Sequence, residues 1–522
     1  MTPAALLAAL GDGGELAILD AREEGEFGTG HLFWAVPCPL SRREIVARAL
    51  LPRLATRIVC VDDGSGLAAR LAEWLRAIGC TDVAQLEGGT PAWAAAGQVL
   101  FSGVNVHSKA FGEWVEHEYG TESIDAAALK QWIDEKRDLV VLDSRPLDEF
   151  TRMSIPSGIN VPGGELAYRI GDLVPDPATV VVVNCAGRTR SILGAESLRR
   201  AGVPNRVLAL RNGTMGWQLA GYTPAHGRTE RFPPGRPASA DQALERARRF
   251  AEASGVGVIG ALDLARYEED PERTLYVLDV RDPAEFRAGH RPGSRNAPGG
   301  QLVQATDRWI GVCRARIALI DDDGVRARMT GAWLRQMGHR DVFVVEDGLA
   351  GARSTGDAPV PVPELAAEVA SMEPAALAGQ LADSVVVDLA RSIEFRAGHI
   401  PGALWGVRSR LETLRPALTR KVVVTSPDGV LARLAVPEVE ALAGAPVQVL
   451  RGGTAAWQQA GYPIEANPAE PPDEACVDTY LRPYDRNHGV EAAMREYLSW
   501  EVDLVRDIAR DRTVRFSRAG SE

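Results

Sequence analysis

The sequence lacks the features that would point to a membrane or a nucleic acid. No segment of the 522 residues approaches the run of about 18 apolar residues that a membrane span requires. The N-terminus has no basic region before its short apolar stretch, so it does not resemble a secretory signal. The net charge of −12 argues against nucleic-acid and anionic-membrane partners, since both need clustered basic residues. We therefore expect a cytoplasmic protein that attracts any anion locally.

Cysteine is also scarce, with six residues in the chain. None forms a Cys-x-x-Cys pair, and none has a His or Cys neighbour at a spacing typical of zinc sites. We therefore expect reduced thiols, no metal and no organic cofactor. Five of the six lie in settings that favour inert core residues: Cys38, Cys60, Cys80, Cys313 and Cys476.

What the chain does contain is internal repetition. Four variants of one Gly-rich pattern are LEGGTPAW, LRNGTMGW, VEDGLAGA and LRGGTAAW, at 86–93, 210–217, 345–352 and 450–457. A second pattern precedes each of them, as ILDAREEGEFGTGH, VLDSRPLDEFTRMS, VLDVRDPAEFRAGH and VVDLARSIEFRAGH. Two patterns that recur in the same order indicate four tandem copies of one module.

Within each copy, short apolar runs alternate with helical patterns. This alternation is typical of a small parallel sheet covered by helices on both faces, so the predicted fold class is α/β. Pro- and Gly-rich stretches between the copies are typical of linkers. The expected domains span 1–100, 121–225, 240–357 and 362–467, with a linker at 101–120 and a C-terminal helical tail at 476–516.

The tail has an amphipathic pattern. One helical face carries Val490, Met494, Tyr497, Leu504 and Ile508 at spacings of three, four and seven residues. We expect this face to pack on the body of the chain, and a surface for a partner is the alternative.

One copy alone places a thiol at the end of a strand. Cys185 follows the apolar run TVVVVN and precedes a helical pattern, with Arg188 and Arg190 close behind it. In open α/β sheets this position faces free backbone N–H groups at the positive end of a helix dipole. Those groups and the two arginines predict a pKa for Cys185 that is lowered by about one unit or more. The pattern indicates an activated nucleophile beside an anion cradle.

About four fifths of the chain resembles a tandem array of rhodanese domains, the sulfurtransferase family. The resemblance rests on DSRPLDEF at 143–150, CAGRTR at 185–190 and LRNGTMGW at 210–217. It implies that Cys185 accepts a sulfane sulfur from thiosulfate or a low-molecular-weight persulfide. A thiol or cyanide would then take the sulfur, and a protein could also serve as the acceptor.

The resemblance also implies roles for the residues after the cysteine. The backbone N–H groups of 186–190 would hold the persulfide, and Arg188 and Arg190 would bind the anionic end of the donor. The expected substrate-binding residues are Ala186, Gly187, Arg188, Thr189, Arg190 and Ser191.

The other copies lack the cysteine. Alignment on the Gly-rich strings puts Asp62 and Asp321 opposite it, and Ser426 or Pro427 in the fourth copy. A carboxylate there would repel a second anion and cannot accept a sulfane sulfur. We therefore expect that the second copy alone is active.

Other residues of the second copy invite weaker predictions. Asp143 and Arg145, with Glu149, recur in copies without the cysteine, so we expect them to support the loop through buried hydrogen bonds. Tyr168 and Arg169 could contact the donor, with ordinary helix surface as the alternative. Ser154 stands where the other three copies have histidine, so the pattern places no histidine base.

Two other function classes stay open. The chain could be a relay or scaffold that delivers sulfur to a protein partner, with turnover of small substrates incidental. It could also be a Cys-dependent phosphatase or arsenate reductase. Four residues separate Cys185 from Arg190, whereas the phosphatases that this loop resembles have five, and this shorter loop favours a single sulfur atom over a tetrahedral phosphate.

Overall fold

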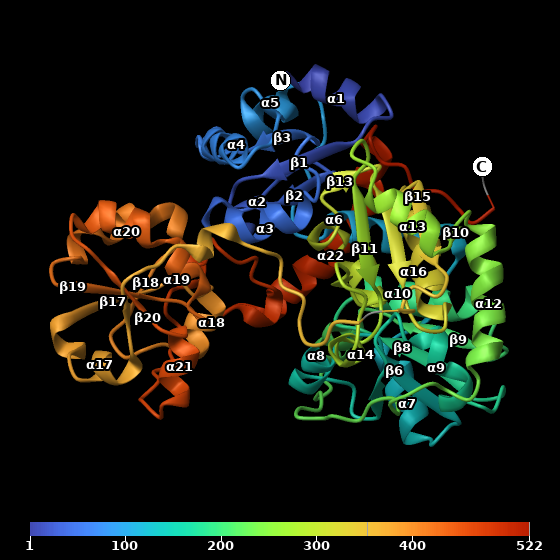
Figure 1. Cartoon of the computed structure of the whole chain (residues 1–522). Coiled ribbons are helices and arrows are strands. Elements are labelled where there is room, and N and C mark those ends of the chain that lie inside the picture. Colours follow the sequence, from blue (N-terminus) through green and yellow to red (C-terminus); the bar gives the residue numbers. More distant parts are fainter. Residues whose placement is uncertain (352, 521–522) are drawn as a thin grey trace.

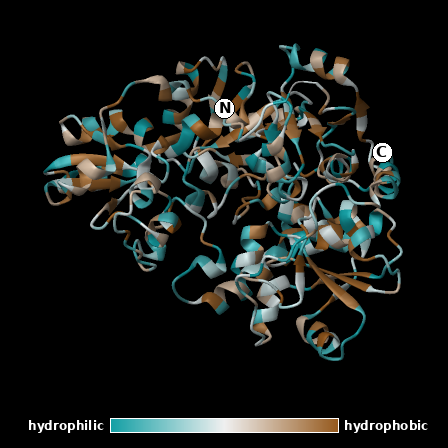
Figure 2. Cartoon of the chain, turned by 60° about the horizontal axis from the view of Figure 1, so that its bottom comes forward, coloured by the Kyte–Doolittle hydropathy of each residue, from teal (hydrophilic) through white to brown (hydrophobic). Residues whose placement is uncertain are grey.

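The computed structural model describes residues 1–351 and 353–520 (Figure 1). Within these residues the chain forms four five-stranded sheets, and each sheet is built mainly from one of the four sequence copies. The first three α/β units pack together, while the fourth stands to one side of the molecule in Figure 1. In Figure 2 hydrophobic residues run along the strands, and the helices carry both hydrophobic and hydrophilic residues.

The first unit has its central strands in the order β1-β3-β4, with β2 beside β1. An antiparallel strand from the third copy, β13 (Val312–Cys313), extends its edge by pairing with β1. The strands are β1 (Leu16–Asp20), β2 (Ala35–Pro37), β3 (Arg57–Val61) and β4 (Asp82–Gln85). The helices are α1 (Pro3–Gly11), α2 (Glu24–Phe27), η1 (Leu40–Arg42), α3 (Arg43–Leu50), α4 (Leu67–Ala77) and α5 (Gly89–Ala95).

The second unit is a parallel sheet in the order β5-β9-β8-β6-β7. Its central strand β8 consists of four valines and an asparagine, which suits a strand covered by helices on both faces. The strands are β5 (Ser123–Ile124), β6 (Leu139–Asp143), β7 (Gly158–Asn160), β8 (Val180–Asn184) and β9 (Val207–Leu210). The helices are α7 (Ala126–Asp134), α8 (Leu147–Arg152), α9 (Leu166–Leu173), α10 (Thr189–Arg200) and α11 (Gly213–Leu219).

The third unit repeats this order as β10-β15-β14-β11-β12. Its strands are β10 (Gly257–Ile259), β11 (Leu275–Asp279), β12 (Arg295–Asn296), β14 (Arg316–Ile320) and β15 (Asp341–Val345). Its helices are α12 (Ala240–Ala253), α13 (Ala261–Glu268), α14 (Pro283–Ala288), α15 (Gly299–Gln304), η2 (Thr306–Arg308) and α16 (Val325–Gln336).

The fourth unit has the order β16-β20-β19-β17-β18. Its strands are β16 (Ser371–Met372), β17 (Ser384–Asp388), β18 (Leu404–Trp405), β19 (Lys421–Thr425) and β20 (Gln448–Leu450). Its helices are η3 (Pro363–Ala366), α17 (Pro374–Ala378), η4 (Leu381–Asp383), α18 (Ser392–Ala397), η5 (Arg408–Ala417), α19 (Val430–Leu434), α20 (Val436–Ala443) and α21 (Gly453–Gln459). The buried guanidinium of Arg408 joins this unit to the first through an ion pair with Glu44.

The second and third units meet through the same turn in each. Gly163 and Gly164 lie against Gly299 and Gly300, where a Cβ on Gly300 would come within 2.8 Å of the nitrogen of Gly164. Only residues without a side chain allow two backbones to approach this closely. The Pro-Gly-Gly turn of each copy therefore fixes how the two units dock.

Two helices outside the repeats fill the space between the units. α6 (Val106–Tyr119) is buried along most of its length, so the segment at 101–120, expected to be a linker, contains a core helix. The tail contains η6 (Asp473–Ala475), η7 (Pro483–Asp485) and α22 (Val490–Arg510). Met494, Leu504 and Ile508 of α22 are buried, which confirms that the apolar face of the tail packs on the body. In the described part of the chain, no helix combines the length and apolar character needed to cross a membrane.

Candidate active site around Cys185

Cys185 lies where β8 ends and α10 is about to begin. Its side chain is 2% exposed, and its Sγ is 3.6 Å from the hydroxyl oxygen of Ser191. The Gly-rich string at 210–217 also contacts the loop, because the backbone N–H of Thr214 donates to the carbonyl oxygen of Cys185 at 2.9 Å. The next residue, Met215, donates in the same way to Ala186. The start of the loop is therefore held before any ligand arrives.

The loop presents open hydrogen-bond donors. Among the described residues, the backbone N–H groups of 186–190 donate to no protein acceptor, whereas that of Ser191 is used within the first turn of α10. Unsatisfied N–H groups at a helix N-terminus attract an anion. This arrangement can hold the terminal sulfur of a persulfide.

The electrostatic prediction for Cys185 is wrong. Burial raises the pKa of its thiol, although the charge of Arg190 and hydrogen bonds from Ser191 act in the opposite direction. The free-energy cost of burying a thiolate is larger here than its stabilisation by the nearby charges and hydrogen bonds. The sequence showed the charges but not how deeply the sulfur is buried.

Both arginines of the loop already have carboxylate partners. Arg188 donates to Glu113 of α6 at 2.8 and 2.7 Å, and it also pairs with Glu116. Arg190 makes a two-bonded ion pair with Glu149 at 2.8 and 2.7 Å. Although burial opposes ionisation, the charge of Arg190 lowers the pKa of Glu149 to about 2. Binding of the donor by these two arginines stays a prediction, since most of their charge is already balanced.

Asp143 and Arg145 lie beneath the loop, as their expected supporting role requires. The Arg145 guanidinium binds the Asp143 carboxylate through two buried hydrogen bonds of 2.8 and 2.7 Å. Asn184, the residue before the cysteine, donates to the same carboxylate at 2.7 Å. Asp143 thus links the start of the loop to the neighbouring strand. Glu149 differs from them, because it faces the cavity beside Cys185.

The residues opposite Cys185 in the other units cap their own helices. Asp62 accepts from the backbone N–H groups of Gly64 and Ala68 at 2.9 Å each. Asp321 accepts in the same way from Gly324 and Ala327. A protein carboxylate therefore occupies the place where a ligand anion would bind.

The fourth unit resolves an ambiguity of the sequence alignment. The hydroxyl of Ser426 accepts from the backbone N–H of Ala432, six residues later, at the spacing found for Asp62 and Asp321. Ser426 and not Pro427 is therefore the counterpart of Cys185. A serine hydroxyl lacks the nucleophilicity of a thiolate unless a base activates it.

The chain matches the rhodanese-like domain family over residues 2–96, 125–220 and 262–354. It belongs to this family. The fourth unit shares the strand order of the second and third units and the capped loop of the first and third, although the family match does not extend to it.

A crystal structure of thiosulfate sulfurtransferase from Pseudomonas aeruginosa is similar to the whole chain. The two share 44% sequence identity with a TM-score of 0.92, and the match covers 99% of each chain. The 3-mercaptopyruvate sulfotransferase SseA from Escherichia coli matches 43% of this chain and 97% of its own, at 20% identity and a TM-score of 0.21. No curated protein sequence matches the chain.

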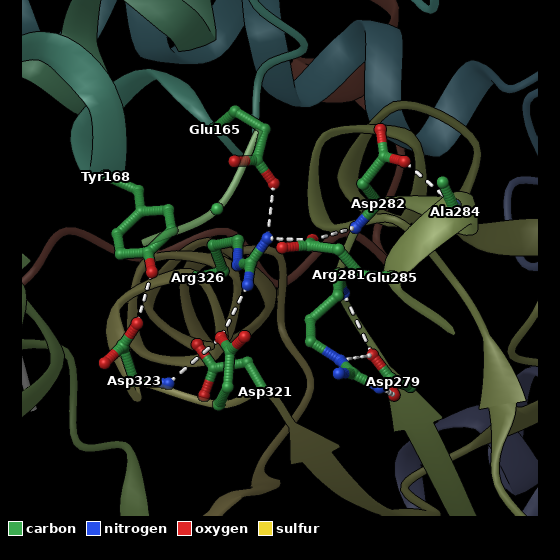
Figure 3. Close-up of polar contacts among 12 residues, drawn as sticks. Glu165, Tyr168, Asp279, Arg281, Asp282, Ala284, Glu285, Asp321, Asp323 and Arg326 are labelled. Carbon is green, nitrogen blue, oxygen red and sulfur yellow. Dashed lines mark hydrogen bonds and ion pairs between the residues drawn. The ribbon is translucent and has the colours of Figure 1, made fainter. Parts of the chain in front are cut away.

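In the third rhodanese-like unit, protein side chains occupy the place that corresponds to the cavity beside Cys185 (Figure 3). Arg326 follows Asp321 by five residues, as Arg190 follows Cys185, and its guanidinium lies between Glu285 and Glu165. Glu165 comes from the second unit. In return, Gln301 of the third unit lies 3.5 Å from Arg190. The two units therefore exchange equivalent residues across their interface.

This exchange corrects the prediction for Tyr168 and Arg169. Tyr168 donates to Asp323 of the third unit, as Figure 3 shows, and Arg169 pairs with Glu165 at 2.8 Å. Both side chains belong to the interface between the units, so they form neither a donor pocket nor ordinary helix surface.

A small cavity of about 60 Å³ opens beside Cys185, with room for a few water molecules. Elements outside the second unit form much of its wall, which the sequence patterns did not reveal. Glu501 could have been noticed, because a charged residue at this position interrupts the apolar face of the tail helix. The lining residues from outside the second unit are Val104, Asn105, Lys109, Gln301, Gln304, Ala305, Arg308, Tyr480, Arg482, Tyr484, Tyr497 and Glu501.

Proposed function

We propose that the chain is a sulfurtransferase that carries one sulfane sulfur as a persulfide on Cys185. The donor is thiosulfate or a low-molecular-weight persulfide, and the acceptor is a small thiol or cyanide. One observation carries this proposal: Cys185 faces unused N–H groups and a cavity, whereas its counterparts in the other units cap their own helices. Membership of the rhodanese-like family and the similarity to a thiosulfate sulfurtransferase support it.

The proposed reaction has two transfers. The Cys185 thiolate attacks the outer sulfur of thiosulfate, the sulfur–sulfur bond of the donor breaks, and sulfite leaves with the electron pair. The acceptor thiolate or cyanide then attacks the terminal sulfur of the persulfide, and Cys185 leaves as the thiolate. The N–H groups of 186–190 stabilise the negative charge on the terminal sulfur between the two steps. No oxidant or reductant is consumed, because the sulfane sulfur keeps its oxidation state.

The surroundings of Cys185 favour small substrates. The sulfur is 2% exposed and the cavity holds only about 60 Å³, so a cysteine on a folded protein could not reach it without an opening movement. All six cysteines of the chain are free thiols, which fits the reducing cytoplasm that we propose as its location.

The test is the intact mass of the protein after brief incubation with thiosulfate, and separately with glutathione persulfide. We expect a gain of about 32 Da, one sulfur atom, that is lost on adding a thiol and is absent in Cys185→Ser. Cys313→Ser is the matched control, since Cys313 is also a free thiol but lies far along the chain in β13. It should load like the wild type.

The other outcomes favour the alternative functions. A wild type that gains no mass from either donor would overturn the persulfide proposal and favour a binding scaffold. A persulfide that reaches protein acceptors much faster than glutathione would favour a relay. Hydrolysis of an aryl phosphate that disappears in Cys185→Ser would favour a phosphatase.

A further inference from the structure

We propose that Lys109, Arg308 and Arg482 form a subsite for the oxyanion end of a sulfur donor such as thiosulfate. This inference rests on the proposed function, because it assumes that Cys185 accepts sulfur from a donor in the cavity. It assigns donor binding to three elements outside the second unit: α6, η2 and the segment before η7.

The three cations differ from the arginines of the cysteine loop in their partners. Five cationic and two carboxylate side chains line the cavity in total. Arg188 and Arg190 are paired with glutamates. Within the described residues, the side chains of Lys109, Arg308 and Arg482 make no hydrogen bond and no ion pair within 4.0 Å. Their donors are therefore available to an anion that enters the cavity.

Lys109 is the central member of the subsite. Its side chain is 4% exposed, and its Nζ lies 4.5 Å from the ring centroids of both Tyr497 and Trp500. Contact with two aromatic faces stabilises a cation and fixes its position. It does not replace the hydrogen bonds that a buried ammonium loses with water. Burial lowers the pKa of Lys109 to about 8, although the negative charge of Glu501 acts in the opposite direction.

In the described part of the chain, Glu501 of the tail makes no ion pair with Lys109, although the two opposite charges act on each other. One of its carboxylate oxygens accepts from the Tyr497 hydroxyl at 3.1 Å and from Thr189 at 3.4 Å. Among the described residues, the other carboxylate oxygen has no hydrogen-bond partner. It lies next to Gly187, 3.0 Å from the position that a Cβ on this glycine would take. Glu501 thus faces the cysteine loop, while burial raises the pKa of its carboxyl group.

The origin of the three cations gives the inactive parts of the chain a role. Arg308 belongs to the third unit, Lys109 to the helix that joins the first two units, and Arg482 to the tail. A detached second unit would keep Cys185 and its N–H cradle but lose this charge. Oxyanion recognition therefore requires the assembled chain.

The test compares two donors on the full-length protein. Lys109→Met and Arg482→Met remove the charge but keep an unbranched apolar side chain of similar reach. The rate of persulfide formation is measured against the concentration of thiosulfate, and against that of ethyl persulfide, which has no oxyanion group. Lys130→Met is the matched control, because Lys130 is an exposed lysine of the second unit, in α7.

We expect each cavity variant to raise the half-saturating thiosulfate concentration about ten-fold or more relative to its effect with ethyl persulfide, which is the loss expected for one hydrogen bond to a charged group. Lys130→Met should leave both donors unaffected. Calorimetric titration of Cys185→Ala with thiosulfate should show binding that weakens when Arg482→Met is added, and this readout does not depend on turnover.

Equal losses with both donors, in variants that keep the wild-type unfolding transition, would overturn the inference. So would unchanged thiosulfate dependence in both variants. In either case the wild type would still form its persulfide, and the proposed function would stand. A wild type that forms no persulfide with any donor would instead remove the proposed function itself.

Discussion

The contact between Gly213 and the cysteine loop provides a direct test of how the cradle is held. Gly213 has a φ of +52°, and a Cβ at this position would lie 2.3 Å from the carbonyl oxygen of Cys185 and 2.8 Å from that of Gly187. Gly213→Ala therefore forces the loop to move by about 1 Å, and a misplacement of that size can cost about 100-fold in rate. An alanine at positive φ also costs about 1–3 kcal/mol of stability.

A matched control exists in the first unit, which has an aspartate in place of the cysteine. Gly89 has a φ of +59°, and its Cβ would lie 2.3 Å from the carbonyl oxygen of Asp62, the counterpart of Cys185. Gly89→Ala should therefore lose a similar amount of stability without affecting the active loop. The assay is the rate of persulfide formation by intact mass, together with urea unfolding of each variant.

We expect Gly213→Ala to form the persulfide about 100 times more slowly and Gly89→Ala to form it at the wild-type rate. A Gly213→Ala protein that loads at the wild-type rate would refute the idea that the Gly-rich string positions the cradle. Equal loss of loading in both variants would show that global stability, and not the loop, sets the rate.

Three further predictions concern charge and packing. Burial raises the pKa of Asp388 to about 6, so the wild type should lose stability as the pH rises from about 4 through 6. Asp388→Asn should remove this loss, so urea unfolding at pH 7 should give a free energy of unfolding higher than that of the wild type by up to about 3 kcal/mol. Because burial raises the pKa of Cys185, the maximal rate of persulfide formation should keep rising with pH in a pH series of loading kinetics. In the same series, the half-saturating thiosulfate concentration should rise above about pH 8 as Lys109 loses its proton, and Lys109→Met should lack this second effect. Leu504→Ala removes a fully buried side chain of the tail helix and should lower the free energy of unfolding in urea by about 2–5 kcal/mol. The variant should also speed alkylation of Cys185 by iodoacetamide, and unchanged alkylation would contradict the packing of the tail over the site.

Much of the fold could be predicted because the repeats carry local signals. The valine run of β8 and the recurring Gly-rich strings indicated the α/β class and four copies, and the structure has four sheets of related strand order. The place of Cys185 between a strand and a helix followed from the same local pattern. The Asp143–Arg145 pair was also predictable, since its members are two residues apart.

Features that depend on distant segments were missed. Residues 101–120 were expected to be a linker because they lie outside the repeats and join the first two copies. α6 is nevertheless buried, since its polar residues find partners, such as Arg188 for Glu113. Tyr168 was placed on the wrong surface because its partner Asp323 lies 155 positions away in the chain. Periodicity shows which face of a helix is apolar, but not which element will cover it.

The position of the proposed chemistry follows from the amino-acid sequence alone. The sequence placed one thiol in a loop that can hold an anion, and it put Asp62 and Asp321 at the same position of two other copies. These are local properties, set by residue type and by the turn from strand to helix. The tertiary structure alone decided the charge around that thiol: packing buries Cys185, pairs its arginines with Glu113 and Glu149, and brings cations from three other segments to the cavity. Burial and counterions arise from contacts between distant parts of the chain, so no local pattern encodes them.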